Sequence, residues 1–109
     1  MTDKLIVFVA CESREQGEAI AESVISSQLA ACVNVIPGVR SCYLWDGKLT
    51  WSDEVVLLIK TTQSRFGQLQ TRVRELHSYE IPEIVSVEIE EGFDKYIEWI
   101  DKTVVKHTT

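Results

Sequence analysis

The sequence lacks several features that would define a class of protein at once. No run approaches the ~18 apolar residues that a membrane-spanning helix needs, and no basic leader precedes an apolar segment as in a secretory signal. Basic residues are also few, since 17 acidic and 11 basic side chains give a formal net charge of −6. Surfaces that bind nucleic acid or anionic membranes need a basic stripe. We therefore expect neither as a partner.

Cysteine and histidine are scarce as well. The three cysteines, Cys11, Cys32 and Cys42, are an odd number at wide spacing and form no Cys-x-x-Cys motif. This excludes a fully paired disulfide framework within one chain, a zinc ribbon and a thioredoxin motif, and it fits a reducing compartment. The two histidines, His77 and His107, are too few for a catalytic zinc site within one chain, because His107 lies in the predicted tail.

The strongest local pattern predicts a long β-hairpin over residues 32–62. Asp46-Gly47 lies between two runs of β-forming residues, and this dipeptide favours a type I′ turn. Pro37-Gly38 interrupts the first arm and predicts a bulge there. An unbroken arm of about 14 residues would reach ~45 Å, whereas a compact domain of this length has a radius of gyration of ~13 Å. The hairpin must therefore bend, protrude or pack on a neighbour.

Hydrophobic periodicity predicts five further elements around the hairpin. They are a strand over residues 4–11, a helix capped by Ser13 that runs to about Gln28, a helix capped by Ser64 with Leu69, Val73 and Leu76 inward, a strand over 84–90 and a short helix from Gly92 with Phe93 inward. The order predicts the α+β class: a ferredoxin-like β-α-β-β-α-β sandwich with an extended hairpin and a C-terminal helix. We expect a single domain over residues 1–109, with a loose tail from about residue 103.

This plan leaves apolar surface that one chain cannot cover. The first strand and residues 55–59 are apolar throughout, which predicts burial on both faces, yet both crossover helices of a ferredoxin-like sheet lie on one face. The outer hairpin would also expose large apolar side chains. We expect a homo-oligomer whose interface includes Tyr43, Trp45, Leu49 and Trp51.

Three residues could carry chemistry. His77, at the end of the second helix, is either a ligand of a metal or anion or a structural residue that bonds free carbonyl groups. Cys11 ends the first strand, where it is either a ligand or a buried, inert thiol. Glu54 begins an apolar strand segment, where a carboxylate is costly without a partner. Its candidate companions are Lys60, Arg40 or a metal ion.

Five segments of the chain resemble the CutA family of divalent-cation tolerance proteins. They are residues 29–38, 43–48, 54–62, 76–84 and 96–100, in the family's order over about residues 5–100. The resemblance implies a cytoplasmic homotrimer with PII-like architecture, linked to tolerance of copper and other divalent metals. It implies no catalysis and no required cofactor, with copper or another divalent ion as ligand.

The resemblance also implies a set of metal ligands. His77 and Glu54 match positions of the family pattern, and Cys11 matches its first-strand cysteine with a displacement along the strand. Two other functions stay open. One is a signalling trimer that binds a small metabolite in clefts between subunits, and the other is a hydrolase that uses Cys11 and His77, which must then lie within ~3–4 Å of each other.

Overall fold

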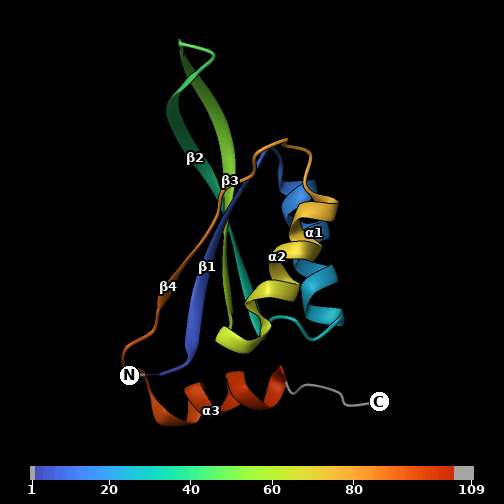
Figure 1. The fold of residues 1–109 in the computed structure, drawn as a ribbon, viewed down its shortest axis with the longest axis vertical. Helices are drawn as coiled ribbons and strands as arrows, with labels where there is room; N and C mark the ends of the chain where they lie inside the picture. Colours follow the sequence, from blue (N-terminus) through green and yellow to red (C-terminus); the bar gives the residue numbers. More distant parts are fainter. Residues whose placement is uncertain (1, 105–109) are drawn as a thin grey trace.

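The computed structural model describes residues 2–104, in which four antiparallel strands form a sheet of order β2-β3-β1-β4 (Figure 1). The elements are β1 (Lys4–Cys11), α1 (Arg14–Ser26), β2 (Cys32–Trp45), β3 (Lys48–Thr62), a 3₁₀ turn η1 (Gln63–Arg65), α2 (Phe66–Leu76), β4 (Ile84–Glu88) and α3 (Asp94–Thr103). The first and third strands occupy the centre of the sheet. This confirms the α+β, ferredoxin-like prediction.

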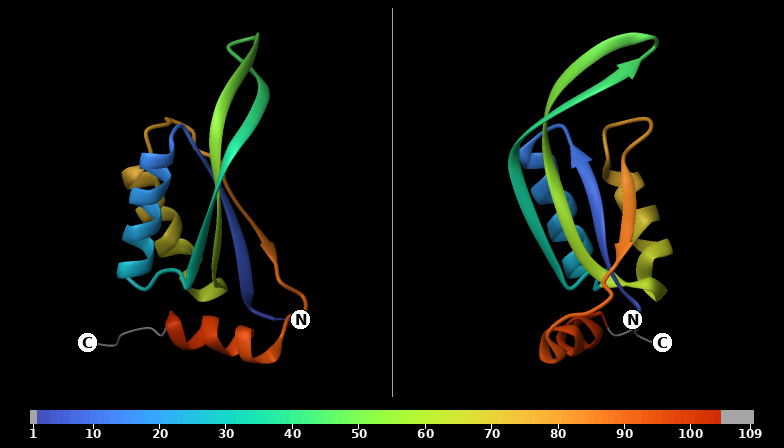
Figure 2. Two further views of the ribbon diagram at one scale, coloured as in Figure 1. Left: turned by 180° about the vertical axis from the view of Figure 1, so that it is seen from behind. Right: turned by 90° about the vertical axis from the view of Figure 1, so that its left-hand side faces the viewer.

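The main core lies between the sheet and helices α1 and α2, which cover one face (Figure 2). Alternate residues of β1 and β3 point toward these helices, because successive side chains of a strand point to opposite faces. The most buried members are Val7, Val9, Ile20, Val24, Leu57, Ile59, Leu69 and Val73. Helix α3 lies across the end of the sheet, where Ile100 and Val104 pack with Ala31. No helix within residues 2–104 combines the length and apolar composition that crossing a membrane requires.

The hairpin has the predicted turn and bulge. Asp46 and Gly47 have φ values of 52° and 75°, as a type I′ turn requires. The pairing of β2 with β3 shifts between Ile36 and Val39, and Gly38 has a φ of 78°. Beyond the bulge the hairpin bends and projects past the rest of the sheet (Figure 2). The molecule measures 44 × 31 × 21 Å as a result.

The sheet face opposite α1 and α2 is apolar and largely uncovered. We call it the open face, and its residues are Ile6, Phe8, Val56, Leu58, Val85 and Val87. Val85 and Val87 of β4 are 51% and 50% exposed, although their alternation predicts an inward face. The predicted burial of the central strands on both faces is therefore incomplete within one chain.

Some element ends differ from the prediction. Ser64 does not cap α2: its hydroxyl pairs with that of Thr62, and η1 leads into the helix at Phe66. Phe93 precedes α3 and is exposed rather than inward. Helix α3 continues through Thr103 and Val104 is buried, so the first residues of the predicted loose tail are ordered, while residues 105–109 lie outside the described part.

We predict that Leu69→Ala lowers the free energy of unfolding by about 2–5 kcal/mol, because its side chain is fully buried between α2 and the sheet. Leu76→Ala on the same helix is the matched control. Leu76, which the periodicity predicts to face inward, is instead 43% exposed, so we expect a loss below about 1 kcal/mol. Urea titration of both variants measures the difference, and equal losses would contradict the assigned core.

Candidate functional site

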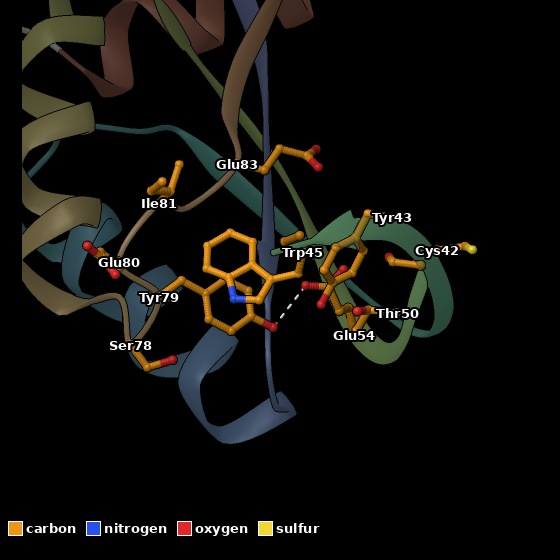
Figure 3. Close-up of a pocket in the computed structure, with 12 residues that line it drawn as sticks. Cys42, Tyr43, Trp45, Thr50, Glu54, Ser78, Tyr79, Glu80, Ile81 and Glu83 are labelled. Carbon is orange, nitrogen blue, oxygen red and sulfur yellow. Dashed lines mark hydrogen bonds between the residues drawn. The ribbon is translucent and has the colours of Figure 1, made fainter. Parts of the chain in front are cut away.

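A cleft opens between the outer hairpin and the loop that joins α2 to β4. Its volume is about 760 Å³, within the ~300–1,000 Å³ range of small-molecule sites. The lining residues are Ala10, Ser41, Cys42, Tyr43, Trp45, Thr50, Glu54, Ser78, Tyr79, Glu80, Ile81 and Glu83 (Figure 3). The hairpin supplies one wall and residues 78–83 supply the other. Alternation along β3 places Glu54 on the same side of the sheet as the open face.

His77 fixes the loop to the end of β1. The imidazole Nε2 lies 2.7 Å from the carbonyl oxygen of Ala10, and the backbone N–H of Tyr79 donates to Nδ1 at 3.0 Å. Because Nδ1 accepts a hydrogen bond from the Tyr79 N–H, Nε2–H is the donor to the carbonyl oxygen of Ala10. His77 is buried in this position. In this chain both ring nitrogens are thus used in holding the loop.

Tyr79 connects the loop to β3. Its hydroxyl donates to Oε2 of Glu54 at 2.9 Å, as the dashed line in Figure 3 marks. Burial raises the pKa of the Tyr79 phenol, and the hydrogen bond to the Glu54 carboxylate raises it further. The phenol therefore remains a protonated donor at neutral pH. His77 thus attaches the loop to β1, and Tyr79 attaches it to β3.

Glu54 has no cationic partner among the described residues. The predicted companions lie elsewhere, since Lys60 bonds the side-chain oxygen of Asn34, and Arg40 pairs with Asp53 at 3.2 Å. Glu54 is 8% exposed, and its second carboxylate oxygen accepts no hydrogen bond from residues 2–104. A buried carboxylate without a countercharge is costly. It is therefore the strongest candidate in this cleft for contact with a cation or with another subunit.

Cys11 is fully buried on the other side of the sheet. Its backbone pairs with Val55, so its side chain faces the helices whereas Glu54 faces the opposite side. Burial raises the pKa of the Cys11 thiol to about 11, and the negative charge of Glu54 adds to the shift. At neutral pH the residue is a thiol, which is a poor nucleophile and a poor metal ligand compared with a thiolate.

The structure does not gather the predicted ligands into a closed metal site. Within residues 2–104 no group of three or more His, Cys, Asp or Glu side chains could hold a metal ion. Cys11 and Glu54 are separated by the sheet, and the His77 nitrogens bond main-chain groups. The Cys11 and His77 pair that a hydrolase would need is not formed here. A metal set of His77, Glu54 and Cys11 stays a prediction.

The four predicted interface residues divide between the two faces of the hairpin. Tyr43 and Trp45 line the cleft, whereas Leu49 and Trp51 point to the opposite face, beside Leu44. The sequence contains the signal for this division. A two-residue turn at 46–47 pairs residue 45 with 48 and 42 with 51, so the two tryptophans must lie on opposite faces. All four are exposed in the single chain, and their role in an interface stays a prediction.

Three residues of the cleft that the later argument uses, Tyr79, Glu80 and Glu83, were missed by sequence reasoning as functional candidates. They lie in the loop between α2 and β4, and irregular segments give no periodicity that would indicate where a side chain points. Pro82 marks the turn but does not indicate that Tyr79 reaches Glu54.

The fold and the cleft define a ferredoxin-like α+β domain with a projecting hairpin and a ligand-sized cleft at its base. Residues 5–103 match the family described as CutA1 divalent ion tolerance protein, and the chain belongs to that family. It is 41% identical to the divalent-cation tolerance protein CutA of Thermus thermophilus over 95 residues, which are 87% of this chain and 92% of that protein. It is 42% identical to the chloroplastic CutA protein of Arabidopsis thaliana over 96 residues, 88% of this chain and 53% of that one. The chain thus spans about half the length of the plant relative.

Solved structures of family members share the whole fold. The Thermus thermophilus protein superposes with a TM-score of 0.90 at 39% identity, covering 92% of this chain and 97% of that one. CutA from Xylella fastidiosa gives a TM-score of 0.94 at 34% identity, covering 95% and 100%. CutA1 from Oryza sativa gives 0.92 at 38% identity, covering 95% of each chain. The family is named for tolerance of divalent ions and not for a catalytic activity.

We predict that the Cys11 thiol makes the fold sensitive to alkaline pH. The unfolded thiol loses its proton near its ordinary pKa of 9.0, whereas the folded one retains it to about pH 11. The unfolded chain therefore binds fewer protons in this window, and the free energy of unfolding falls by up to about 2–3 kcal/mol between pH 9 and 11. Below pH 9 the thiol is protonated in both the folded and the unfolded chain, so Cys11 causes no pH-dependent loss of stability there.

Urea titrations of the wild type and Cys11→Ala across this pH range measure the effect, since the variant should lose this part of the alkaline decrease. Cys42→Ala, at an exposed cysteine, should behave as the wild type does. An identical pH profile for the wild type and Cys11→Ala would exclude the assigned cause.

Proposed function

We propose that the protein is a homotrimer that binds divalent metal ions, copper among them, and that it acts by binding and not by catalysis. The observation that supports metal binding most directly is Glu54, a buried residue on the border of a ligand-sized cleft. Tyr79 bonds one of its carboxylate oxygens, and within residues 2–104 the other oxygen has no hydrogen-bond partner and no cation pairs with the carboxylate. The net charge of −6 favours the approach of cations. Free cysteines at positions 11, 32 and 42 support a reducing, cytoplasmic location as part of the proposal.

The open face supports the proposed self-association. Helices α1 and α2 cover only the opposite face, so β4 leaves Val85 and Val87 half exposed beside the central strands. Contiguous apolar surface of this kind is typical of an interface between chains. Trp51 and Leu49 add a second apolar surface on the projecting hairpin. Three copies are what the resemblance to the CutA family implies.

A neighbouring chain would also help to complete the proposed metal site. Glu54 offers one oxygen, and His77 could bind a metal only after releasing Ala10 or Tyr79. Cys11 could contribute only if it lost its proton and its buried position. Symmetry of an oligomer can supply further copies of a ligand to a shared site. An imidazole and carboxylate set suits copper or zinc better than magnesium.

We predict that Val87→Glu weakens assembly, because it places a charge on an apolar surface that another copy would cover. Sedimentation over a dilution series should show at least about tenfold weaker association, since 1.4 kcal/mol changes an equilibrium constant tenfold. Thr71→Glu, on the exposed surface of α2, is the control and should not alter assembly. A Val87→Glu protein that associates as the wild type does would contradict the proposed interface.

For metal binding, we predict that Glu54→Gln and His77→Ala each lower the affinity for copper(II) by about tenfold or more. Glutamine at position 54 retains an oxygen that can accept from Tyr79, so the loop should stay in place. Glu75→Gln, at an exposed carboxylate of α2, is the matched control. Calorimetry measures all three, and unchanged copper binding in Glu54→Gln would remove that residue from the site.

One observation favours a second candidate function, a signalling trimer that binds a small ligand. The cleft is larger than a bare metal ion needs, and aromatic side chains contribute to both of its walls, Tyr43 and Trp45 from the hairpin and Tyr79 from the loop. Clefts of this size that combine aromatic side chains with polar groups are typical of small-molecule sites.

A further inference from the structure

We propose that the cleft binds an aliphatic organic ammonium ion, such as a polyamine. This inference deepens the second candidate function and rests on the cleft being a ligand site. It follows from two properties of the lining residues. Aromatic rings line both walls of the cleft, and the ionised side chains among its described lining residues are all carboxylates.

The charges select a cation. Carboxylates on the loop and on β3 line the cleft, namely Glu54, Glu80 and Glu83, while no lysine or arginine is among its described lining residues. Glu54 is the important member because it is nine-tenths buried and keeps one oxygen without a hydrogen-bond partner from residues 2–104. The carboxylates would repel an anionic ligand, whereas a cation could pair with the Glu54 oxygen that Tyr79 leaves free.

The aromatic rings select an organic cation over an inorganic one. Tyr43, Trp45 and Tyr79 line the same cleft as Glu54. Figure 3 shows Trp45, Tyr79 and Glu54 near the middle of the view, with Glu83 above them and Glu80 to their left. Hard metal ions need several oxygen ligands and gain little from ring faces. An alkylammonium ion uses both features, because its charge contacts carboxylates and ring faces while its methylene groups pack on the rings.

The dimensions fit a ligand with more than one charge. The volume of about 760 Å³ far exceeds that of a single ammonium group. The carboxylates come from two different elements, Glu54 from β3 and Glu83 from the loop before β4, and in Figure 3 Glu54 lies beside the Trp45 and Tyr79 rings while Glu83 lies above them. A flexible chain with amines at intervals can reach separated carboxylates. We therefore infer a polyamine as the preferred class.

Two tryptophans on one hairpin give a matched test. Trp45 lines the cleft, whereas Trp51 lies on the opposite face under the guanidinium group of Arg40, 5.1 Å from its ring centre. Substitution of either by leucine removes the same aromatic group from the same hairpin. Only the loss of Trp45 removes a ring from the cleft.

The experiment is a calorimetric titration of the full-length protein with spermidine at pH 7 and constant ionic strength. We expect saturable binding that an equal concentration of magnesium chloride does not displace. Trp45→Leu should weaken it about fivefold to thirtyfold, the range of a desolvated cation–π contact. Glu54→Gln should weaken it at least about tenfold. Trp51→Leu should bind spermidine as the wild type does. Circular dichroism and sedimentation confirm that each variant keeps its fold and assembly.

Three outcomes would overturn the inference. They are the absence of saturable spermidine binding, its full displacement by magnesium, and equal losses in Trp45→Leu and Trp51→Leu. Copper titration of the same preparations separates this inference from the proposed metal function. Copper binding without spermidine binding refutes the organic cation alone, whereas spermidine binding without copper binding refutes the metal function alone.

Discussion

The geometry of the cleft depends on the difference in length between two neighbouring strands. β1 ends at Cys11, which pairs with Val55, but β3 extends beyond this point and pairs only with β2 from Glu54 outward. From Glu54 outward the sheet therefore consists of β2 and β3 alone, and a space opens beside β3 where β1 has ended. The loop from α2 to β4 crosses this space and Tyr79 reaches into it. A carboxylate is tolerated at Glu54 because it lies at the boundary between the dry sheet and the cleft.

Two hydrogen bonds fix the loop at that boundary. His77 bonds the Ala10 carbonyl near the end of β1, and Tyr79 bonds Glu54 just beyond it on β3. Buried polar groups need partners, and here each bond satisfies one group from the sheet with one from the loop. The same residues that could bind a ligand therefore determine where the loop lies. A ligand that engages Glu54 acts on a segment that is already ordered, which lowers the entropy lost on binding.

Much of the fold could be predicted because its signals are local. The dipeptide Asp46-Gly47 favours positive φ independently of the rest of the chain. The continuous apolar residues of β1 and of the base of β3 identify the central strands of the sheet. The partner of Glu54 could not be predicted in this way. The bulge between Ile36 and Val39 places Arg40 opposite Asp53, so the residue that seemed available to Glu54 pairs with a different carboxylate. Sequence spacing shows where charges occur, but strand register decides which of them meet.

The candidate site was predicted least well where it depends on irregular backbone. Glu54, His77 and Cys11 were recognised one by one, yet whether they converge depends on faces of the sheet and on the loop path. Register separates Cys11 from Glu54, and the loop uses both nitrogens of His77. Tyr79 gave no signal because loop residues have no period. The start of α2 was also predicted wrongly. The chain first forms the 3₁₀ turn η1, so the helix begins at Phe66 and the Ser64 side chain does not cap it.

The cleft and the open face lie on the same side of the sheet. This position links the proposed self-association to the proposed ligand site. Ala10 and Glu54 alternate with the same phase as Phe8 and Val56, so a chain that covers the open face also comes close to the cleft. Any ligand that contacts two chains there would strengthen their association, and association would raise the ligand's affinity by the same factor. If another copy covers the open face as proposed, the carboxylate of Glu54, which accepts a hydrogen bond from Tyr79 and has no cationic partner within residues 2–104, would lie at the boundary between chains.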